Sequence, residues 1–310
     1  MDKIVGAIVQ YGPEYLDKDK SLEKAIELAK EAAERGANYI VFGETWLSGY
    51  PAWLDHCPDV AGWDHEPVKE VFAKTYANGI VIPGPEVEVL CKLAKQLKVG
   101  ICMGANEVVN SGPKNGTIYN SLILINEKGQ LVNHHRKLMP TFTEKMVYGL
   151  GDGHGLRSAE IHGAKIGGLV CWEHWMPLTR QAMHNSGEQI HAAVWPNVHE
   201  MLQIASRSYA FEGRCFVLAA GQIMRAKEIP AELELPAKFK DQPDALVLRG
   251  GSSIIAPNGK YLVEPIFDRE EILLAELDLK DIYREKMALD VTGHYQREDV
   301  FQFNYSDKRI

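Results

Sequence analysis

Short apolar runs alternate with amphipathic segments along nearly the whole chain, and this alternation restricts the folds that the chain can form. At the N-terminal end, residues 3–10 predict a buried strand, residues 19–36 an amphipathic helix and residues 39–44 a second strand. Strands that are apolar throughout and separated by helices are typical of sheets covered by helices. We find no repeat of short period and no disordered linker. We therefore expect an α/β fold with a single domain over residues 1–310.

Further elements follow the same pattern to the end of the chain. Helices are expected at 66–78, 86–97, 177–185, 200–213 and 280–289, and strands at 99–107, 119–126, 131–136, 166–170, 191–195, 215–220, 252–256, 261–263 and 272–277. Apart from the helix at 66–78, the segment 48–85 is rich in Pro, Gly and aromatic residues, and we expect it to form a wall or an interface. The segment 226–247 has no clear period and is expected to be an exposed excursion.

A thiol stands where the apolar run 166–170 ends. Cys171 follows this run, and Pro177 suits the first position of a helix, so Cys171 lies in a turn between a strand and a helix. The sheet holds such a side chain firmly, and the backbone N–H groups that follow it are free to bind an anion. This position suits a nucleophile, although a free cysteine is more often a buried core residue. We interpret the other cysteines as structural: Cys57, Cys91, Cys102 and Cys215.

Two more ionisable side chains, Glu44 and Lys137, stand at the ends of predicted strands. Each alone could be a solvated strand cap, but with Cys171 they form a coherent set. A thiol is a good nucleophile as thiolate, and a neighbouring carboxylate can accept its proton. We therefore expect Glu44 as general base, with Lys137 and the N–H of Trp172 stabilising the charge that develops on the attacked group. Eleven histidines leave a papain-like Cys–His arrangement open.

Charge and cysteine content limit the partners of the chain. The 42 acidic residues exceed the 34 basic ones, and no Lys/Arg cluster occurs, so we expect a small-molecule substrate and neither nucleic acid nor membrane. No stretch approaches the ~20 apolar residues of a membrane span. The five cysteines are widely spaced, without a C-x-x-C pair, which indicates a reducing cytoplasmic location and no structural zinc.

Three motifs carry a resemblance to a known family. The segments Gly-Glu44-Thr-Trp-Leu-Ser-Gly-Tyr-Pro51, His135-Arg-Lys137-Leu-Met-Pro-Thr-Phe-Thr-Glu144 and Gly168-Leu-Val-Cys171-Trp-Glu-His-Trp-Met-Pro-Leu178 resemble the nitrilase superfamily, in this order and over nearly the whole chain. The resemblance implies a four-layer αββα sandwich with Glu44, Lys137 and Cys171 as a Glu-Lys-Cys triad. It implies Glu144 as a second glutamate that orients the lysine and the substrate. It also implies a homodimer or a higher homo-oligomer, including octamers and spiral filaments.

The residues after the cysteine resemble one branch of the superfamily. Cys-Trp-Glu-His followed by Met-Pro-Leu is similar to true nitrilases, whereas amidases and carbamoylases commonly place Tyr-Asp or Arg-Asp there. The resemblance implies that a nitrile and water give a carboxylic acid and ammonia through a covalent thioimidate and thioester on Cys171, with no metal or organic cofactor. The alternatives are an amidase or carbamoylase of the same superfamily and a non-catalytic binding or scaffold protein on the same fold.

The sequence also offers candidates for the wall of the substrate pocket. Large aromatic residues near the motifs could line an apolar pocket, although they are more often core residues. A histidine after the cysteine could face the pocket or support the start of the helix, and an asparagine past a strand end could reach the pocket wall. The pocket residues that we predict are Tyr50, Trp53, His174, Trp195 and Asn197.

Overall fold

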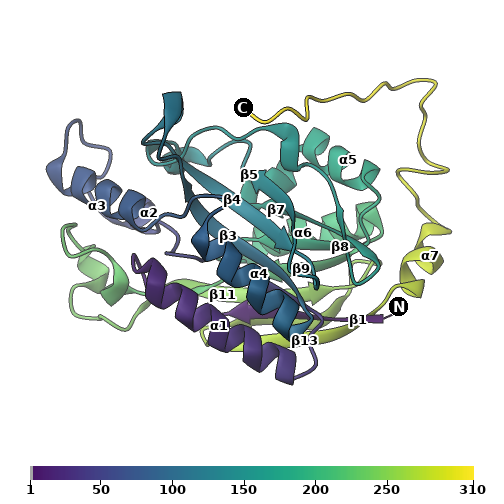
Figure 1. Cartoon of the computed structure of the whole chain (residues 1–310), viewed down its shortest axis with the longest axis horizontal. Helices are drawn as coiled ribbons and strands as arrows, with labels where there is room; N and C mark the ends of the chain where they lie inside the picture. The colour runs from purple at the N-terminus through teal and green to yellow at the C-terminus, as the bar shows by residue number, and fades with distance from the viewer. Residues whose placement is uncertain (1–2) are drawn as a thin grey trace.

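The computed structural model describes residues 3–310 and contains two sheets that pack face to face (Figure 1). The first sheet consists, in order, of β13 (Glu271–Asp278), β1 (Lys3–Gln10), β2 (Tyr39–Phe42), β3 (Gly100–Val108), β4 (Ile118–Ile125) and β5 (Leu131–Arg136). The second consists of β10 (Ile223–Arg225), β11 (Leu246–Ile255), β9 (Phe216–Ala220), β8 (Ile190–Val194), β7 (Ala164–Val170) and β6 (Ala159–Ile161), with β12 (Tyr261–Phe267) paired to β11. Each sheet has three parallel strands at its centre, β1–β2–β3 and β7–β8–β9.

Helices cover the outer face of each sheet. α1 (Lys18–Glu34) and α4 (Pro85–Leu97) lie on the first sheet, and α5 (Pro177–Asn185) and α6 (Glu200–Gly213) lie on the second (Figure 1). The layers are therefore α, β, β and α, which confirms the four-layer sandwich expected from the resemblance. The other helices are α2 (Trp53–His56), α3 (Glu66–Ala77) and α7 (Lys280–Lys286). None of the helices formed by residues 3–310 combines the length and the hydropathy that a membrane span requires.

Burial on both faces explains why the central strands are apolar throughout. In β1, Ile4 and Ile8 belong to the core between the two sheets, whereas Ala7 and Val9 belong to the core under α1 and α4. Successive side chains of a strand point to opposite faces, so a strand in the middle of four layers has no polar face. Full burial of each isoleucine stabilises the fold by about 1.5–3 kcal/mol.

The segment 226–247, which we expected to be an exposed excursion, is partly buried. Its regular structure is limited to two short 3₁₀ turns, Ala226–Glu228 and Ala237–Phe239. Ile229, Leu233 and Phe239 nevertheless pack in a core that also contains Trp53, so the prediction of exposure was wrong for these side chains. The sequence did not indicate this core, because the apolar residues of segment 226–247 occur singly and show neither a helix nor a strand period.

β2 and β5 end at the same side of the first sheet, which brings together Glu44 and Lys137, the site residues that follow these two strands. β4 is antiparallel to β3, and β5 is antiparallel to β4, so β5 runs in the direction of β2. The turn after β2 lies directly on Gly104 of β3. A Cβ atom at Gly104 would lie 2.2 Å from the carbonyl oxygen of Gly43 and 2.6 Å from the amide nitrogen of Thr45. Residue 104 must therefore be a glycine, because any side chain there would displace the turn that carries Glu44.

Candidate active site

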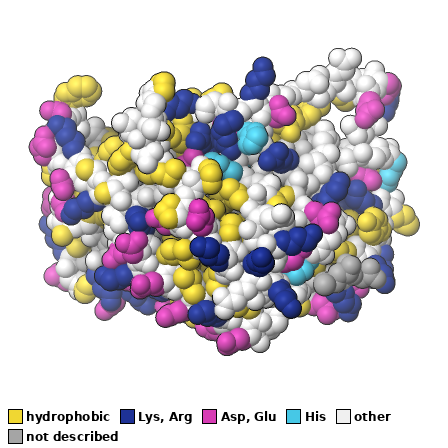
Figure 2. Space-filling view, in the orientation of Figure 1, with side chains coloured by type: hydrophobic (Ala, Val, Ile, Leu, Met, Phe, Trp, Pro, Cys, Tyr) yellow, Lys and Arg dark blue, Asp and Glu magenta, His cyan; other side chains and the backbone are white. Residues whose placement is uncertain are grey.

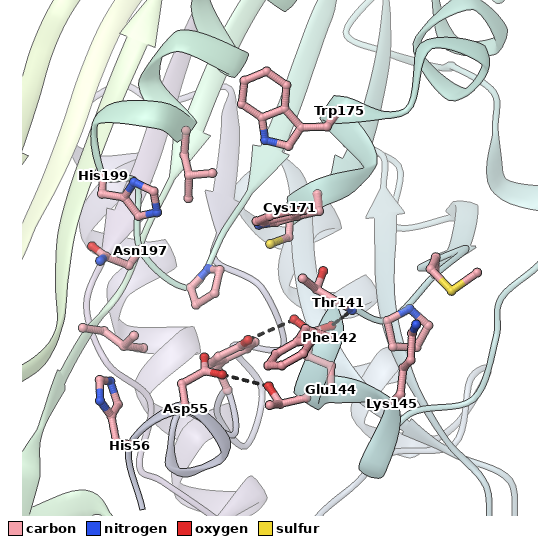
Figure 3. Close-up of a pocket in the computed structure, with 18 of the residues that line it drawn as sticks. Asp55, His56, Thr141, Phe142, Glu144, Lys145, Cys171, Trp175, Asn197 and His199 are labelled. Atoms are coloured by element: carbon pink, nitrogen blue, oxygen red, sulfur yellow. Dashed lines mark hydrogen bonds between the residues drawn. The ribbon is translucent and has the colours of Figure 1, made fainter. Parts of the chain in front are cut away.

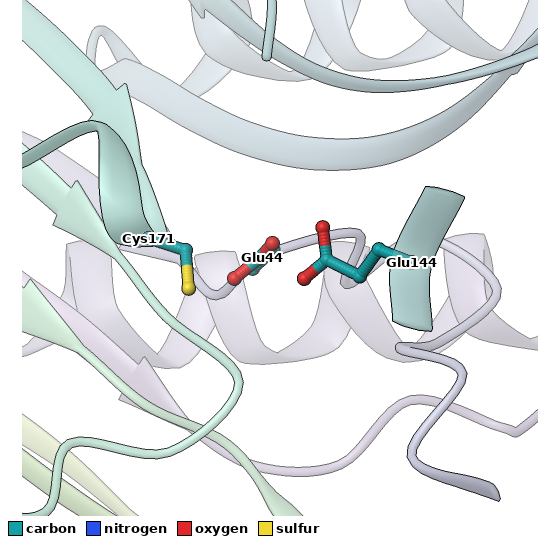
Figure 4. Close-up of side chains that lie close together, drawn as sticks. All are labelled: Glu44, Glu144 and Cys171. Atoms are coloured by element: carbon teal, nitrogen blue, oxygen red, sulfur yellow. The ribbon is translucent and has the colours of Figure 1, made fainter. Parts of the chain in front are cut away.

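The structure brings the predicted ionisable residues together in the interior. Lys137 Nζ donates a hydrogen bond to Glu44 Oε1 at 2.9 Å, and to both carboxylate oxygens of Glu144 at 2.9 and 2.7 Å. Cys171 Sγ and carboxylate oxygens of Glu44 and Glu144 all lie within 4.8 Å of one another (Figure 4). The four side chains are buried, and that of Lys137 has no exposed surface.

Two carboxylates and a thiol at this spacing could in principle hold a metal ion. In this site, however, the ammonium group of Lys137 already donates to both carboxylates. A cation placed among the same oxygens would be repelled by this buried positive charge. The donor set is therefore matched to a lysine rather than to a metal.

Further hydrogen bonds fix the two carboxylates. The Tyr50 hydroxyl donates to Glu144 Oε1 at 2.9 Å, and the Thr141 amide donates to Glu144 Oε2 at 3.0 Å. Asn120 Nδ2 donates to Glu44 Oε1 at 2.7 Å. Glu44 Oε2 is buried and has no hydrogen-bond partner within residues 3–310, so it is an acceptor that is free to take a proton.

Burial and charge set the protonation of the site. Burial raises the pKa of Glu44 to about 7, opposed by Lys137 and supported by Glu144. Burial, together with Glu44, also raises the pKa of the Cys171 thiol well above its usual value, although Lys137 opposes the shift. Burial would lower the pKa of Lys137, but its acidic neighbours Cys171, Glu44 and Glu144 outweigh this effect and raise that pKa. At neutral pH the site thus holds an ammonium, a thiol and a carboxyl group poised to exchange a proton.

The backbone at Cys171 is in the left-handed region, with φ at 52°. A non-glycine residue there costs of order 1–3 kcal/mol, which the surrounding structure must offset. Cys171 directly follows β7, and the backbone N–H of Trp172 acts on the thiol and lowers its pKa against the effect of burial. The turn therefore places a backbone donor next to the sulfur.

Glu173 holds this turn, although the sequence did not indicate it. Its buried carboxylate accepts hydrogen bonds from the amides of Val170 and Leu138, both at 2.8 Å, and from His135 Nε2 at 2.8 Å. It thereby joins the turn after β7 to the turn after β5, which carries Lys137. Asn120 was also missed. In sequence both are ordinary polar residues, and only the fold brings them to partners 35 and 76 residues away.

A cavity of about 880 Å³ opens above Cys171 (Figure 3). Two of the predicted pocket residues, Tyr50 and Asn197, line it. The Trp172 side chain lines it too and is 54% exposed, while the amide of the same residue faces the thiol. Much of the remaining wall is apolar, with polar groups in addition; it includes Met139, Phe142, Trp175, Leu202, Val247 and Leu248, and also Asp55, His56, Lys145 and His199.

The other three predicted pocket residues do not line the cavity. Trp53, His174 and Trp195 are at most 1% exposed. Trp53 lies in the core that includes part of segment 226–247, and the His174 ring stacks on Trp195 with ring centroids 4.7 Å apart. A large aromatic residue next to a motif can face the pocket or the core, and the sequence pattern does not distinguish these positions.

An αββα sandwich with Glu, Lys and Cys side chains at one edge has the features of the hydrolases that act on carbon–nitrogen bonds. Residues 7–286 match the carbon-nitrogen hydrolase family, and the chain belongs to this family, on its nitrilase branch. It is 39% identical to Nitrilase 2 from an unknown prokaryotic organism over 96% of this chain and 90% of that protein. It is 36% identical to the aliphatic nitrilase of Sinorhizobium fredii over 97% of this chain and 95% of that protein.

A solved structure shares the fold. The chain superimposes on Nit3 from Saccharomyces cerevisiae, a member of branch 10 of the nitrilase superfamily, with a TM-score of 0.72. The match covers 96% of this chain and 97% of that one at 23% sequence identity. At this identity the likeness establishes the architecture, and the site must be argued from its own residues.

Proposed function

We propose that this chain is a nitrilase that hydrolyses an organic nitrile to the carboxylic acid and ammonia. The observation that carries the proposal is the likeness to nitrilases, at 36–39% identity over nearly the full length of both proteins. The cavity above Cys171 supports it, because much of its wall is apolar and would accept the hydrocarbon part of a nitrile.

In the proposed first step, Cys171 Sγ attacks the nitrile carbon. A sulfur–carbon bond forms and one carbon–nitrogen π bond breaks. Because the thiol pKa is raised, the proton must leave as attack proceeds, and the unpartnered Glu44 Oε2 is placed to accept it. Glu44 passes this proton to the nitrogen, which gives a neutral thioimidate.

Water completes the proposed reaction. Glu44 removes a proton from a first water molecule, whose oxygen adds to the thioimidate carbon. The tetrahedral intermediate breaks its carbon–nitrogen bond and releases ammonia, with protons returned through Glu44, and a thioester remains. A second water molecule then releases the acid and restores the thiol. These steps need neither a metal nor an organic cofactor.

The proposed electrostatic roles follow from the hydrogen bonds. Lys137 and the Trp172 N–H would stabilise the charge that develops on the attacked group, an effect worth about 3–4 kcal/mol per donor. Glu144 would keep Lys137 charged and aimed at the reacting atoms, because it accepts from Nζ through both carboxylate oxygens. Tyr50 and Thr141 hold Glu144 in that orientation.

A substrate panel tests the proposal. Ammonia release and product identity are measured for a series of nitriles and their matching amides, with the wild type, Cys171→Ala and the control Cys91→Ala, which changes a half-buried thiol on α4. We expect acid and ammonia from nitriles with the wild type and the control, and none with Cys171→Ala. Turnover of amides alone would support an amidase or carbamoylase. No turnover, together with a Cys171 that substrate does not protect from a thiol reagent, would support a non-catalytic protein.

We also infer a homodimer, or a higher oligomer built from it, that uses α5 and α6. The two helices lie side by side, since Arg180 of α5 pairs with Glu212 of α6 at 3.0 Å. Their outer surface exposes large apolar side chains, and exposed patches of this kind mark interaction sites. These side chains are Leu178, Met201, Ile204 and Phe211, which are 48–72% exposed.

For location and partners we propose the cytoplasm and a small-molecule substrate rather than nucleic acid. All five cysteines are free thiols, which suits a reducing compartment. The net charge is −8, and the face in Figure 2 shows acidic and basic side chains intermingled. This face offers no extended basic path for a phosphate backbone.

A further inference from the structure

Behind the Cys171 turn lies a buried chain of hydrogen bonds that the proposed reaction does not use. His174 Nδ1 lies 2.6 Å from the Cys171 carbonyl oxygen, and His174 Nε2 lies 2.9 Å from His191 Nε2. His191 Nδ1 lies 2.8 Å from Glu188 Oε2, and the Tyr209 hydroxyl donates to the other oxygen of Glu188. These four side chains are at most 5% exposed, so the chain is closed to solvent.

Packing holds the members of this chain in place. His191 lies in β8, and its ring stacks on that of Tyr209 from α6 with centroids 3.9 Å apart. His174 stacks on Trp195, just beyond β8, as described above. Two further charged or titratable groups approach the chain. His184 Nδ1 lies 3.5 Å from Glu188 Oε1, and Arg180 donates to the His174 carbonyl at 3.1 Å.

The two ends of the chain determine where its protons lie. The Cys171 carbonyl oxygen can only accept, so His174 Nδ1 carries a hydrogen. Burial opposes ionisation of Glu188, but His191 lowers the pKa of this carboxyl group to about 2, so Glu188 is a carboxylate and His191 Nδ1 carries a hydrogen. The contact between the two Nε2 atoms needs a third hydrogen.

Two neutral imidazoles supply only two hydrogens in total, so the pair carries one positive charge, balanced by Glu188. The Glu188 carboxylate contacts His191, whereas the other partner of His174 is a neutral carbonyl oxygen, so the charge belongs on the ring next to the carboxylate. Burial lowers the pKa of His174 well below its usual value, in agreement with a neutral His174. The chain therefore runs from the Glu188 carboxylate through the His191 imidazolium and the neutral His174 imidazole to the Cys171 carbonyl oxygen. Each hydrogen bond in such a series polarises the next one.

We propose that Glu188, His191 and His174 polarise the peptide group between Cys171 and Trp172, and so strengthen the N–H donor that faces the reacting sulfur. In a planar trans peptide, C=O and N–H point in opposite directions. The carbonyl of this group faces His174, and its N–H, that of Trp172, points to the opposite side and lowers the pKa of the thiol. His174 is therefore a positioning residue. This inference rests on the proposed function, in which the Trp172 N–H stabilises developing charge.

Two substitutions test the chain. His174→Phe keeps a ring stacked on Trp195 but cannot donate to the carbonyl, and Glu188→Gln keeps the size of the side chain but removes the charge. Loss of a whole donor of this kind costs about 10²–10³ in kcat, so a weakened donor should lower kcat on a nitrile about tenfold, with KM unchanged. Alkylation of Cys171 by iodoacetamide, without nitrile, should be several-fold slower in both variants. His174→Asn, whose amide can donate to the same carbonyl, should recover part of the loss.

His134→Phe is the matched control. It removes an imidazole bonded to a buried carboxylate, Glu107, in the first sheet, and should leave kcat and alkylation as in the wild type. A wild-type kcat and alkylation rate in Glu188→Gln, or an equal loss in His134→Phe, would overturn the proposal. If His174→Phe fails to fold, the kcat and the alkylation rate of Glu188→Gln decide whether the proposal holds. If the wild type hydrolyses no nitrile, the proposed function fails, while the alkylation series still tests the polarised peptide.

Discussion

Glu44 and Cys171 share a low-dielectric site in which neither group is strongly ionised at neutral pH. Burial raises the pKa of both groups, so the nucleophile is a thiol, and its proton must move during attack. This differs from a cysteine paired with a cationic histidine, where the thiolate exists beforehand. The group that accepts the thiol proton has to be an ionised Glu44. Because the pKa of Glu44 is raised to about 7, its ionisation can be followed within the pH range of ordinary enzyme assays.

The activity should therefore depend on the charge of Glu44. Below a pH of about 7 the carboxyl group of the free protein is protonated and cannot accept the thiol proton, and above it the carboxylate is available. We expect kcat/KM to rise with pH through about 7, and Glu44→Gln to lose activity at every pH. The measurement is kcat/KM for nitrile hydrolysis from pH 5.5 to 8.5, with the exposed Glu160→Gln as control. A flat profile across this range would contradict the assignment.

Lys137 balances the charge of two carboxylates that are at most 1% exposed. In Lys137→Met, Glu44 and Glu144 would face each other in the interior without a cation. Breaking a buried ion pair by removing one partner costs about 3–5 kcal/mol, so we expect a loss of this size in the free energy of unfolding, together with loss of activity.

Urea denaturation checks the stability of this variant. Lys145→Met, which removes an exposed lysine at the pocket rim, should unfold within about 0.5 kcal/mol of the wild type. The double variant Lys137→Met with Glu144→Gln should regain part of the stability but none of the activity. Wild-type stability in Lys137→Met would mean that the carboxylates are compensated in some other way.

At the scale of elements, the site depends on a contact between the turn after β5 in the first sheet and the turn after β7 in the second. The apolar run 166–170 and the strand expected at 131–136 predicted β7 and β5, and with them the positions of Cys171 and Lys137 at strand ends. These local patterns could not predict that Glu173 links the two turns, because hydrogen bonds between distant segments leave no trace in local periodicity. The edge strands β6 and β10 were missed for a related reason, since three residues are too few to show a period.

Glu173→Ala should separate the two turns. The amides of Val170 and Leu138 and the ring of His135 would each lose an acceptor in the interior. We expect a loss of about 3–5 kcal/mol in the free energy of unfolding and faster hydrogen exchange at the two amides, because a buried charged acceptor is removed. Urea denaturation and amide exchange measure these effects, with Glu160→Ala on β6 as an exposed control. Unchanged exchange at Val170 and Leu138 would show that Glu173 does not hold the turns.

At the scale of the whole molecule, the parts of the site that the sequence predicted are those at strand ends. Glu44, Lys137 and Cys171 could be found because sheet geometry makes the position after a strand special. The pocket was predicted less well: Tyr50 and Asn197 reach it, but Trp195 lies behind it in the core. Which face an aromatic side chain takes depends on how the layers stack, and residues far apart in the chain set that stacking.

The outer surface of α5 and α6 is also explained only at this scale. A helix that covers a sheet needs apolar residues on the face that packs on the sheet, and not on its outer face. Leu178 and Ile204 are 72% and 48% exposed on the outer side, where a helix of an isolated sandwich would carry polar groups. If two sandwiches pack through these helices, Leu178→Asp combined with Ile204→Asp places like charges in the interface. We expect this double variant to be a monomer, because buried unpaired charges oppose association.

Light scattering coupled to size-exclusion chromatography measures the molar mass of each variant, against a 34.7 kDa chain. The control is Leu262→Lys, which changes a side chain 46% exposed on β12, and it should keep the wild-type mass. Because α5 begins directly after the Cys171 turn and α6 contributes Leu202 to the pocket wall, separation of the sandwiches should also lower nitrile turnover. If the double variant has the wild-type mass, the interface lies on another face. If the wild type is a monomer, the inferred interface does not exist.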